Sequence, residues 1–168
     1  MTKLSDQLVT IRPVKAGDQA ALAALLSDRQ TVEASGLQLP DPDDVASWQW
    51  ALNILVTKDR GLWLVIERAS NSLAGVMSLV PSTTGFDLGY LLGPTFRGRG
   101  LMTSAVKLLL TDLRRQKQPV MVTASTSISN VASQRVLQRA GFQRLTPGED
   151  RGVLQWCWTT QSKKIQRK

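Results

Sequence analysis

The stretch Leu88-Gly-Tyr-Leu-Leu-Gly-Pro-Thr-Phe-Arg97-Gly-Arg-Gly100-Leu-Met-Thr-Ser-Ala105 decides how this chain folds. It begins as an apolar strand, passes through a turn rich in glycine and arginine, and continues directly into a helix. Apolar residues recur on one face of that helix, at Met102, Ala105, Val106, Leu109, Leu110 and Leu113. The pattern predicts a strand and a long amphipathic helix joined by a short, positively charged loop.

This loop has the features of an anion-binding site. The first turn of a helix leaves backbone N–H groups free, and the helix dipole adds roughly half a positive charge there. Gly98 and Gly100 let an anion approach the backbone, and Arg97 and Arg99 add full positive charge. We therefore expect a phosphate to bind here and, given the width of the loop, a diphosphate. The P-loop and dinucleotide fingerprints both match it poorly.

The rest of the sequence places the loop in one α/β (α+β) domain. Strands are predicted at 10–12, 62–67, 73–80, 87–92, 119–123 and 152–160, and helices begin at Asp18, Asp41, Gly100 and Asn130. This order predicts a mixed sheet with helices on its faces. The 168 residues correspond to about one domain, and residues 161–168 are predicted to form a basic tail.

The composition excludes several kinds of chemistry. The sequence has no histidine and a single cysteine, Cys157. Histidine-dependent nucleophiles, histidine-ligated zinc, thiolate clusters and an internal disulfide are therefore excluded, and we expect no metal. The lone cysteine, and the lack of a signal segment or an 18-residue apolar run, predict a cytoplasmic protein with no membrane span. The net charge of +8 favours a phosphorylated partner.

Arg97-Gly-Arg-Gly-Leu-Met102 resembles the Q/R-x-x-G-x-G/A acyl-CoA loop of the GNAT superfamily of N-acetyltransferases. The preceding strand agrees with this family, as do Asn130-x-x-Ser133 and Gly141-Phe142 after the loop, in the same order and spacing. The resemblance covers roughly residues 8–160. Near the start, Ile11-Arg-Pro and Gly17-Asp18 resemble the opening of the subgroup that acetylates the N-terminal alanine of ribosomal proteins.

The resemblance implies the GNAT fold as a single domain over 8–160, with helices flanking a central sheet that splays open between the strands at 87–92 and 119–123. It also implies acetyl-CoA as co-substrate. The loop amides would bind its pyrophosphate, Arg99 would reach a phosphate, and Leu91, Leu92 and Asn130 would contact the pantetheine arm. The implied cofactor-binding residues are Leu91, Leu92, Arg97, Gly98, Arg99, Gly100, Leu101, Met102, Thr103 and Asn130.

The sequence departs from the family pattern at two positions. Met102 replaces the usual glycine or alanine, and only its N–H is needed for binding. Leu137 stands where the family often has a tyrosine general acid, so that role is vacant or falls to Ser133. The resemblance implies that a strand carboxylate relays the proton of the amine; we expect Asp87 to do so, with Glu67 in reserve. The alternative is that Asp87 is only a strand-end acid facing solvent.

The pKa of the acceptor amine favours one substrate class. Deprotonating a lysine at pH 7 costs about 4.6 kcal/mol, whereas an α-amino group costs only about 1–1.4 kcal/mol. A site without histidine therefore suits a protein or peptide N-terminus better than a lysine. Three alternatives remain open: a small-molecule amine acetyltransferase, an acyl-CoA-binding protein without catalysis, and a basic nucleic-acid-binding module, against which the few aromatic residues argue.

The sequence also allows a second copy of the chain as a partner. A homodimer is implied by the family resemblance. Trp156 and Trp158 share one face of the last predicted strand, where they form either a dimer patch or part of the core.

Overall fold

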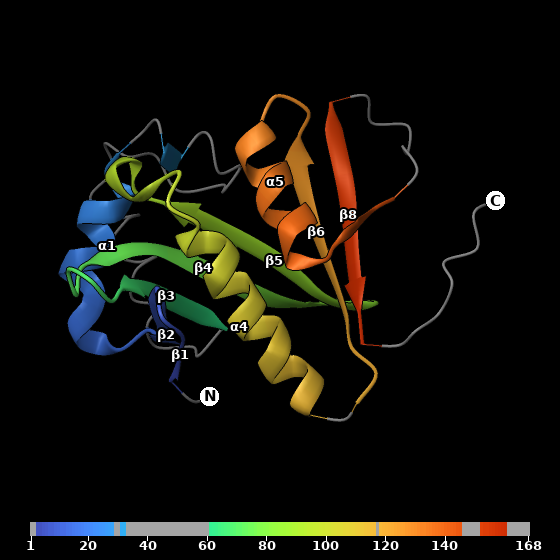
Figure 1. Ribbon diagram of the computed structural model, residues 1–168, viewed down its shortest axis with the longest axis horizontal. Coiled ribbons are helices and arrows are strands. Elements are labelled where there is room, and N and C mark those ends of the chain that lie inside the picture. Colours follow the sequence, from blue (N-terminus) through green and yellow to red (C-terminus); the bar gives the residue numbers. More distant parts are fainter. Residues whose placement is uncertain (1–2, 29–30, 33–60, 117, 146–151, 161–168) are drawn as a thin grey trace.

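A computed structural model describes residues 3–28, 31–32, 61–116, 118–145 and 152–160, which contain an eight-stranded mixed sheet (Figure 1). Its strands are β1 (Leu4–Ser5), β2 (Val9–Pro13), β3 (Leu62–Glu67), β4 (Leu73–Ser82), β5 (Gly85–Leu92), β6 (Met121–Ser127), β7 (Gln143–Arg144) and β8 (Val153–Thr159), in the order β1-β2-β3-β4-β5-β6-β8-β7. The helices within the described ranges include α1 (Gln19–Leu26), α4 (Leu101–Arg115) and α5 (Val131–Ala140), with 3-10 turns at η1 (Ala16–Asp18) and η2 (Pro94–Phe96).

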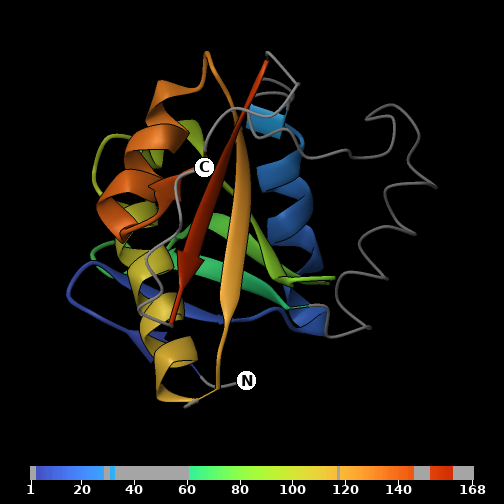
Figure 2. The ribbon, with the colours of Figure 1, turned by 90° about the vertical axis from the view of Figure 1, so that its right-hand side faces the viewer.

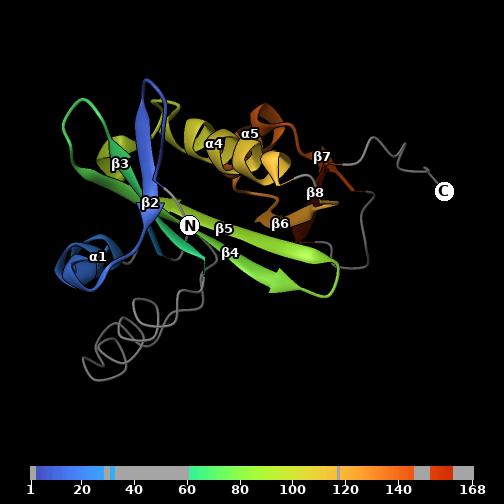
Figure 3. The same cartoon turned by 90° about the horizontal axis from the view of Figure 1, so that it is seen from below.

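The helices cover the sheet on both faces. Figure 2 and Figure 3 show α4 and α5 on one face and α1 on the other. The larger core lies on the α4 side, and its buried side chains include Trp63, Met102 and Trp156. A smaller core lies under α1. Successive residues of β5 alternate between the two, so that Leu88, Tyr90 and Leu92 pack with the larger core while Leu91 packs with the smaller one.

The sheet opens between β5 and β6, its parallel pair. These strands pair only at Phe86↔Val122 and Asp87↔Thr123, although β5 continues to Leu92 and β6 to Ser127. Gly85 stands just before this vertex with φ +151°, and a Cβ there would lie 2.1 Å from the Met121 carbonyl oxygen. The close approach therefore depends on glycine. The predicted fold, including the splay between these two strands, is confirmed.

The best-patterned elements agree with the predictions. The strands predicted at 62–67 and 73–80 form the antiparallel pair β3–β4, and the helix after Gly100 is α4. Asn130 caps α5 by accepting a hydrogen bond from the Ser133 N–H at 3.0 Å. Gly141 ends that helix in the left-handed conformation, with φ +95°.

The sequence analysis was wrong about where β6 begins and ends. The strand starts at Met121 rather than 119, because Pro119 has no N–H for the ladder. It runs on through a polar segment to Ser127, in which Thr126 is buried and accepts a hydrogen bond from Trp156 Nε1 at 2.9 Å. A search for apolar alternation misses a buried polar residue of this kind. The two-residue strands β1 and β7 were not predicted.

The predictions for the two tryptophans of the last strand, for the start of α1 and for two further segments have separate outcomes. Trp156 and Trp158 are 1% and 4% exposed, so they belong to the core of this chain. Asp18 is the N-cap residue of α1 as predicted, but its side chain makes no capping hydrogen bond, because its carboxylate is held by both terminal nitrogens of the Arg12 guanidinium at 2.7 Å each. The helix predicted from Asp41 and the basic tail at 161–168 lie outside the described residues.

Candidate functional site

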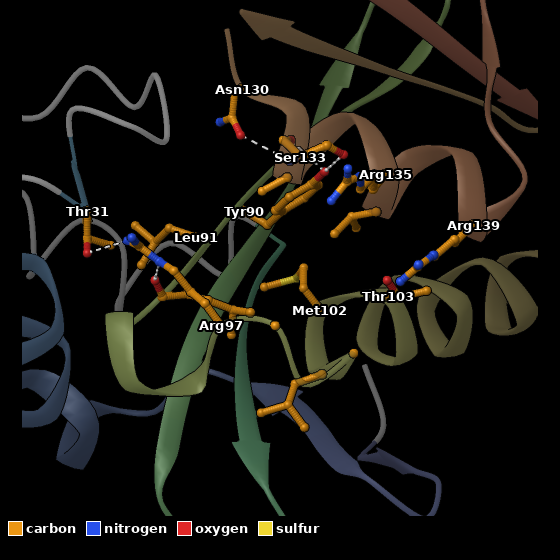
Figure 4. Close-up of a pocket in the computed structure, with 16 residues that line it drawn as sticks. Thr31, Tyr90, Leu91, Arg97, Met102, Thr103, Asn130, Ser133, Arg135 and Arg139 are labelled. Carbon is orange, nitrogen blue, oxygen red and sulfur yellow. Dashed lines mark hydrogen bonds between the residues drawn. The ribbon is translucent and has the colours of Figure 1, made fainter.

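A cavity of about 440 Å³ lies beside the opening between β5 and β6 (Figure 4). Its lining comes from the end of β5, the loop before α4, the first turn of α4, and α5. Nine of the ten residues expected to bind the cofactor line it; these are Leu91, Leu92, Arg97, Gly98, Gly100, Leu101, Met102, Thr103 and Asn130. Folding therefore gathers residues from two distant parts of the sequence around one hollow.

The backbone of the loop explains its glycines. Gly98 and Gly100 have φ +74° and +77°, and a Cβ at either position would meet nothing within 4 Å. The glycines are thus required by conformation, and the space beside them is open. Gly100 is the N-cap of α4 and provides no side chain, so the N–H groups of its first turn are left for a ligand.

Three arginines line the cavity, and two of them were not predicted. Arg97 is held in place by a hydrogen bond to Thr31 Oγ1 at 2.7 Å and another to the Leu92 carbonyl at 3.3 Å. Arg135 and Arg139 reach the cavity from α5 (Figure 4). Their spacing of four residues, which puts two cations on one helix face, is the sequence signal that could have revealed them.

Arg99, the tenth expected residue, is not part of the cavity lining. Its guanidinium pairs instead with Glu67, whose residue is only 4% exposed. The other carboxylate oxygen of Glu67 accepts a hydrogen bond from Ser70 Oγ at 2.7 Å. Arg99 therefore ties the loop to the end of β3 rather than presenting its charge to the cavity.

Tyr90 and Ser133 face each other inside the cavity (Figure 4). Tyr90 Oη lies 2.8 Å from Ser133 Oγ and 3.1 Å from the Ser133 carbonyl oxygen. Burial raises the pKa of Tyr90 to about 12, with the hydrogen bond to Ser133 acting in the opposite direction, so the phenol keeps its proton at neutral pH. The sequence analysis missed Tyr90, although its place beside Leu88 and Leu92 on one strand face was a usable signal.

The two candidate proton acceptors have different surroundings. Asp87 is exposed, and its carboxylate accepts a hydrogen bond from Thr123 Oγ1, at the point where β5 and β6 still pair. Alternation along β5 places it on the face opposite Tyr90, and it does not line the cavity. Glu67 is buried with both carboxylate oxygens engaged. These contacts favour Asp87 over Glu67.

The described residues hold neither a cluster of metal ligands nor a membrane-spanning helix. Across the ranges from 3 to 160 that the structure describes, no group of three or more potential ligands is placed to hold a metal ion. No helix in that part of the chain has the length and apolar character needed to cross a membrane.

A splayed mixed sheet, with a glycine-arginine loop at a helix N-terminus beside its opening, defines the class of acyl-CoA-dependent acetyltransferases. Comparison with protein families agrees: residues 9–143 match the model of the acetyltransferase (GNAT) domain. The chain therefore belongs to the GNAT acetyltransferase family and is an acyltransferase that transfers an acetyl group to an amine. Acetyltransferases of this family use acetyl-CoA.

Solved structures share this fold at low sequence identity. The ribosomal-protein-S5-alanine acetyltransferase from Vibrio fischeri matches with a TM-score of 0.78 and 16% identity, over 96% of this chain and 98% of that one. A ribosomal L7/L12 alpha-N-protein acetyltransferase in complex with coenzyme A matches with 0.76 and 20%, over 94% and 97%. A GNAT-family acetyltransferase from Bacillus anthracis matches with 0.73 and 16%, over 94% and 97%. No curated protein matches the sequence.

Proposed function

We propose that this chain is an N-acetyltransferase that uses acetyl-CoA to acetylate the α-amine of a protein or peptide N-terminus. The observation that carries the proposal is the cavity beside the β5–β6 opening, with its left-handed glycine loop and its three arginines. The residues present fit acetyl-CoA: the open space at Gly98 and Gly100 admits a phosphate, and the cations balance its charge.

Each part of the cavity has a role in holding the co-substrate. The N–H groups from Gly98 to Thr103 would hold the pyrophosphate. The backbone of Leu91 and Leu92 would pair with the pantetheine arm along the edge of β5 that has separated from β6. Arg135 and Arg139 add positive charge from α5. Acetyl-CoA supplies a thioester as the acyl donor. The protein residues bind and orient both substrates and handle the protons.

The amine attacks the thioester carbonyl directly in a ternary complex. A C–N bond forms, the C–S bond breaks, and the electron pair of that bond leaves with sulfur. The amine must lose a proton, which Asp87 would accept through water. Ser133 lines the cavity on the other face and would contact the departing sulfur there. A thiol has a reference pKa of about 8.5, so a thiolate is a tolerable leaving group at neutral pH.

Two observations support an N-terminal α-amine as the acceptor. An α-amine is cheaper to deprotonate than a lysine, by about 3 kcal/mol at pH 7, and this chain has no histidine to help. Two of the solved structures that share its fold are described as acetyltransferases of ribosomal-protein alanine and of a protein α-amine. A cytoplasmic N-terminus is thus our first choice of acceptor, and a small-molecule amine is the second.

The first test is a calorimetric titration with acetyl-CoA at physiological ionic strength. We expect micromolar binding by the wild type and none by Gly100→Glu, which places a negative charge in the loop. Gly17→Glu is the matched control, because Gly17 is exposed and outside the cavity, and should bind like the wild type. If the folded wild type does not bind acetyl-CoA, the proposal is wrong, and salt-dependent binding to DNA should be measured next.

The second test identifies the acceptor and the base. An amine panel led by N-terminal peptides, with internal lysine peptides and polyamines beside them, should show acetylation of the peptides first. Asp87→Asn should lower turnover tenfold or more while leaving acetyl-CoA affinity nearly intact. Unchanged turnover in that variant would remove Asp87 from the mechanism, and a preference for polyamines would identify a small-molecule enzyme.

A further inference from the structure

The side chain of Tyr90 contacts two different oxygens of Ser133, and the two contacts restrict where the protons can lie. Tyr90 Oη is within hydrogen-bond distance of two oxygens of the same residue, the Ser133 carbonyl at 3.1 Å and the Ser133 hydroxyl at 2.8 Å. A phenol has one proton and therefore donates to one of them at a time. The carbonyl can only accept, whereas the hydroxyl can accept or donate.

Two arrangements of the protons satisfy this geometry. In the first, Tyr90 donates to the carbonyl and the Ser133 hydroxyl donates to Tyr90, so the serine proton is used within the pair. In the second, Tyr90 donates to Ser133 Oγ, and the serine proton is left to point elsewhere. Because both side chains line the cavity, that second direction is toward a bound ligand. A negative charge in the cavity stabilises the second arrangement.

We propose that Tyr90 is a positioning residue for acetyl transfer: it donates its proton to Ser133 Oγ and so directs the Ser133 hydroxyl, as hydrogen-bond donor, to the departing sulfur. This inference rests on the proposed function. It assigns a residue to the role left open by Leu137, which is fully buried in the core and has no polar group.

The pair stabilises the thiolate by a hydrogen bond and does not supply a proton to it. The pKa of Tyr90 is about 12, and the reference thiol lies near 8.5, so complete transfer is unfavourable by more than a thousandfold. The C–S electron pair goes to sulfur, its charge accepts the hydrogen bond from Ser133, and the proton of the free thiol comes from water. The high pKa of the phenol thus keeps its proton in place for positioning.

The surroundings hold both side chains in this geometry. The Ser133 N–H donates to Asn130 Oδ1 at 3.0 Å, which fixes the first turn of α5. Tyr90 stands on β5, packed against the larger core, 43 residues earlier in the chain. A purely structural tie between β5 and α5 needs only the carbonyl contact. The second contact, to an oxygen in the cavity, is what points to a role in the reaction.

The test measures the pKa of the thiol in bound coenzyme A, from the ultraviolet absorbance of its thiolate during a pH titration. Tyr90→Phe and Ser133→Ala should each raise this pKa by about one unit relative to the wild type. Ser133→Thr keeps the hydroxyl and should stay near the wild type. The kcat of Tyr90→Phe should fall about tenfold with little change in the KM for acetyl-CoA. The affinity for desulfo-coenzyme A should not change.

Tyr90 is the only tyrosine in the sequence, which allows a second measurement without a mutation. Growth on 3-fluorotyrosine replaces Tyr90 alone with a more acidic phenol of nearly the same shape. A better donor to Ser133 should lower the pKa of the bound thiol, the opposite of Tyr90→Phe, and the fluorine resonance should shift when coenzyme A binds but less when desulfo-coenzyme A binds. The measurement with 3-fluorotyrosine still tests the inference if the Tyr90→Phe variant does not fold.

The outcomes separate this inference from the proposed function. If the wild type binds coenzyme A and acetylates peptides, but the thiol pKa is the same in the wild type, Tyr90→Phe and the fluorinated protein, the inference is wrong and the proposed function stands. An equal loss of affinity for coenzyme A and its desulfo analogue in Tyr90→Phe would show a structural tie and would also overturn the inference. A folded wild type that binds no coenzyme A overturns both.

Discussion

Replacing Gly85 and Gly98 by alanine, one at a time, should damage the protein in two different ways. Both glycines have positive φ, at +151° and +74°, so each alanine carries a backbone strain of about 1–2 kcal/mol. Their surroundings differ. At Gly98 the new methyl group meets nothing within 4 Å, whereas at Gly85 it lies 2.1 Å from the Met121 carbonyl oxygen. Since carbon and oxygen need about 3.3 Å, β6 must retreat by about 1 Å.

That retreat breaks the two residue pairs that join β5 to β6, at Phe86↔Val122 and Asp87↔Thr123. With about 1 kcal/mol lost for each of the two pairs, Gly85→Ala should cost about 3–4 kcal/mol in total. At about 2–4 °C per kcal/mol, the Tm should fall by about 6–16 °C for Gly85→Ala and by about 2–8 °C for Gly98→Ala, so Gly85→Ala should always show the larger fall.

The assay is thermal unfolding without ligand, followed by an acetyl-CoA titration well below the Tm. Gly98→Ala should bind acetyl-CoA about tenfold more weakly despite its small loss of stability, because its methyl group occupies space that the phosphate needs. Equal falls in Tm, or a larger fall for Gly98→Ala, would refute the argument that the vertex of the sheet depends on Gly85.

Three further predictions concern charges. Glu67→Gln removes the partner of Arg99, which ties the loop to β3; the KM for acetyl-CoA should rise about fivefold, with kcat within about twofold of the wild type in steady-state assays. Arg139→Gln should lower acetyl-CoA affinity about fivefold at low salt, and calorimetry at rising salt should show the difference shrinking. The hydrogen bonds from Arg12 lower the pKa of Asp18, so their stabilisation is complete above the unfolded-state pKa of about 3.9 and is lost as the pH falls through the lower folded-state pKa. Urea unfolding should therefore show Asp18→Asn less stable than the wild type at pH 7, and the difference should shrink steadily as the pH falls below about 3.9.

Local patterns in the sequence were enough to predict the elements around the site. The helical spacing from Met102 to Leu113 predicted α4, and Asn130 and Gly141 marked the two ends of α5. Each of these signals depends on neighbours within a few residues, which is why a single sequence contains them. The glycine-arginine loop could be placed at the start of α4 for the same reason, and its residues other than Arg99 line the cavity.

Contacts between distant segments could not be predicted in this way. Arg99 was expected to contact a phosphate because of its place in the loop. In the folded chain its guanidinium forms an ion pair with Glu67, which lies 32 residues earlier. Tyr90 and Ser133 are 43 residues apart, and neither neighbourhood shows that they meet. Which face of β5 reaches α5 is decided by the register of the sheet and the packing of α5 against it. That register is a property of the whole fold.

The register of β5 also explains how one strand serves both ends of the proposed reaction. Asp87 and Tyr90 are three residues apart, an odd number, so their side chains leave the strand on opposite faces. The carboxylate stands at the vertex where β5 and β6 still pair, and the phenol stands further along, where the strands have separated. In the proposed reaction, Asp87 would accept the proton of the amine on one side of the sheet, and Tyr90 would orient the Ser133 hydroxyl toward the departing sulfur on the other. A one-residue shift in the pairing of β5 with β4 would move Tyr90 away from Ser133. Leu137 has no polar group with which to replace it as the residue that positions the Ser133 hydroxyl.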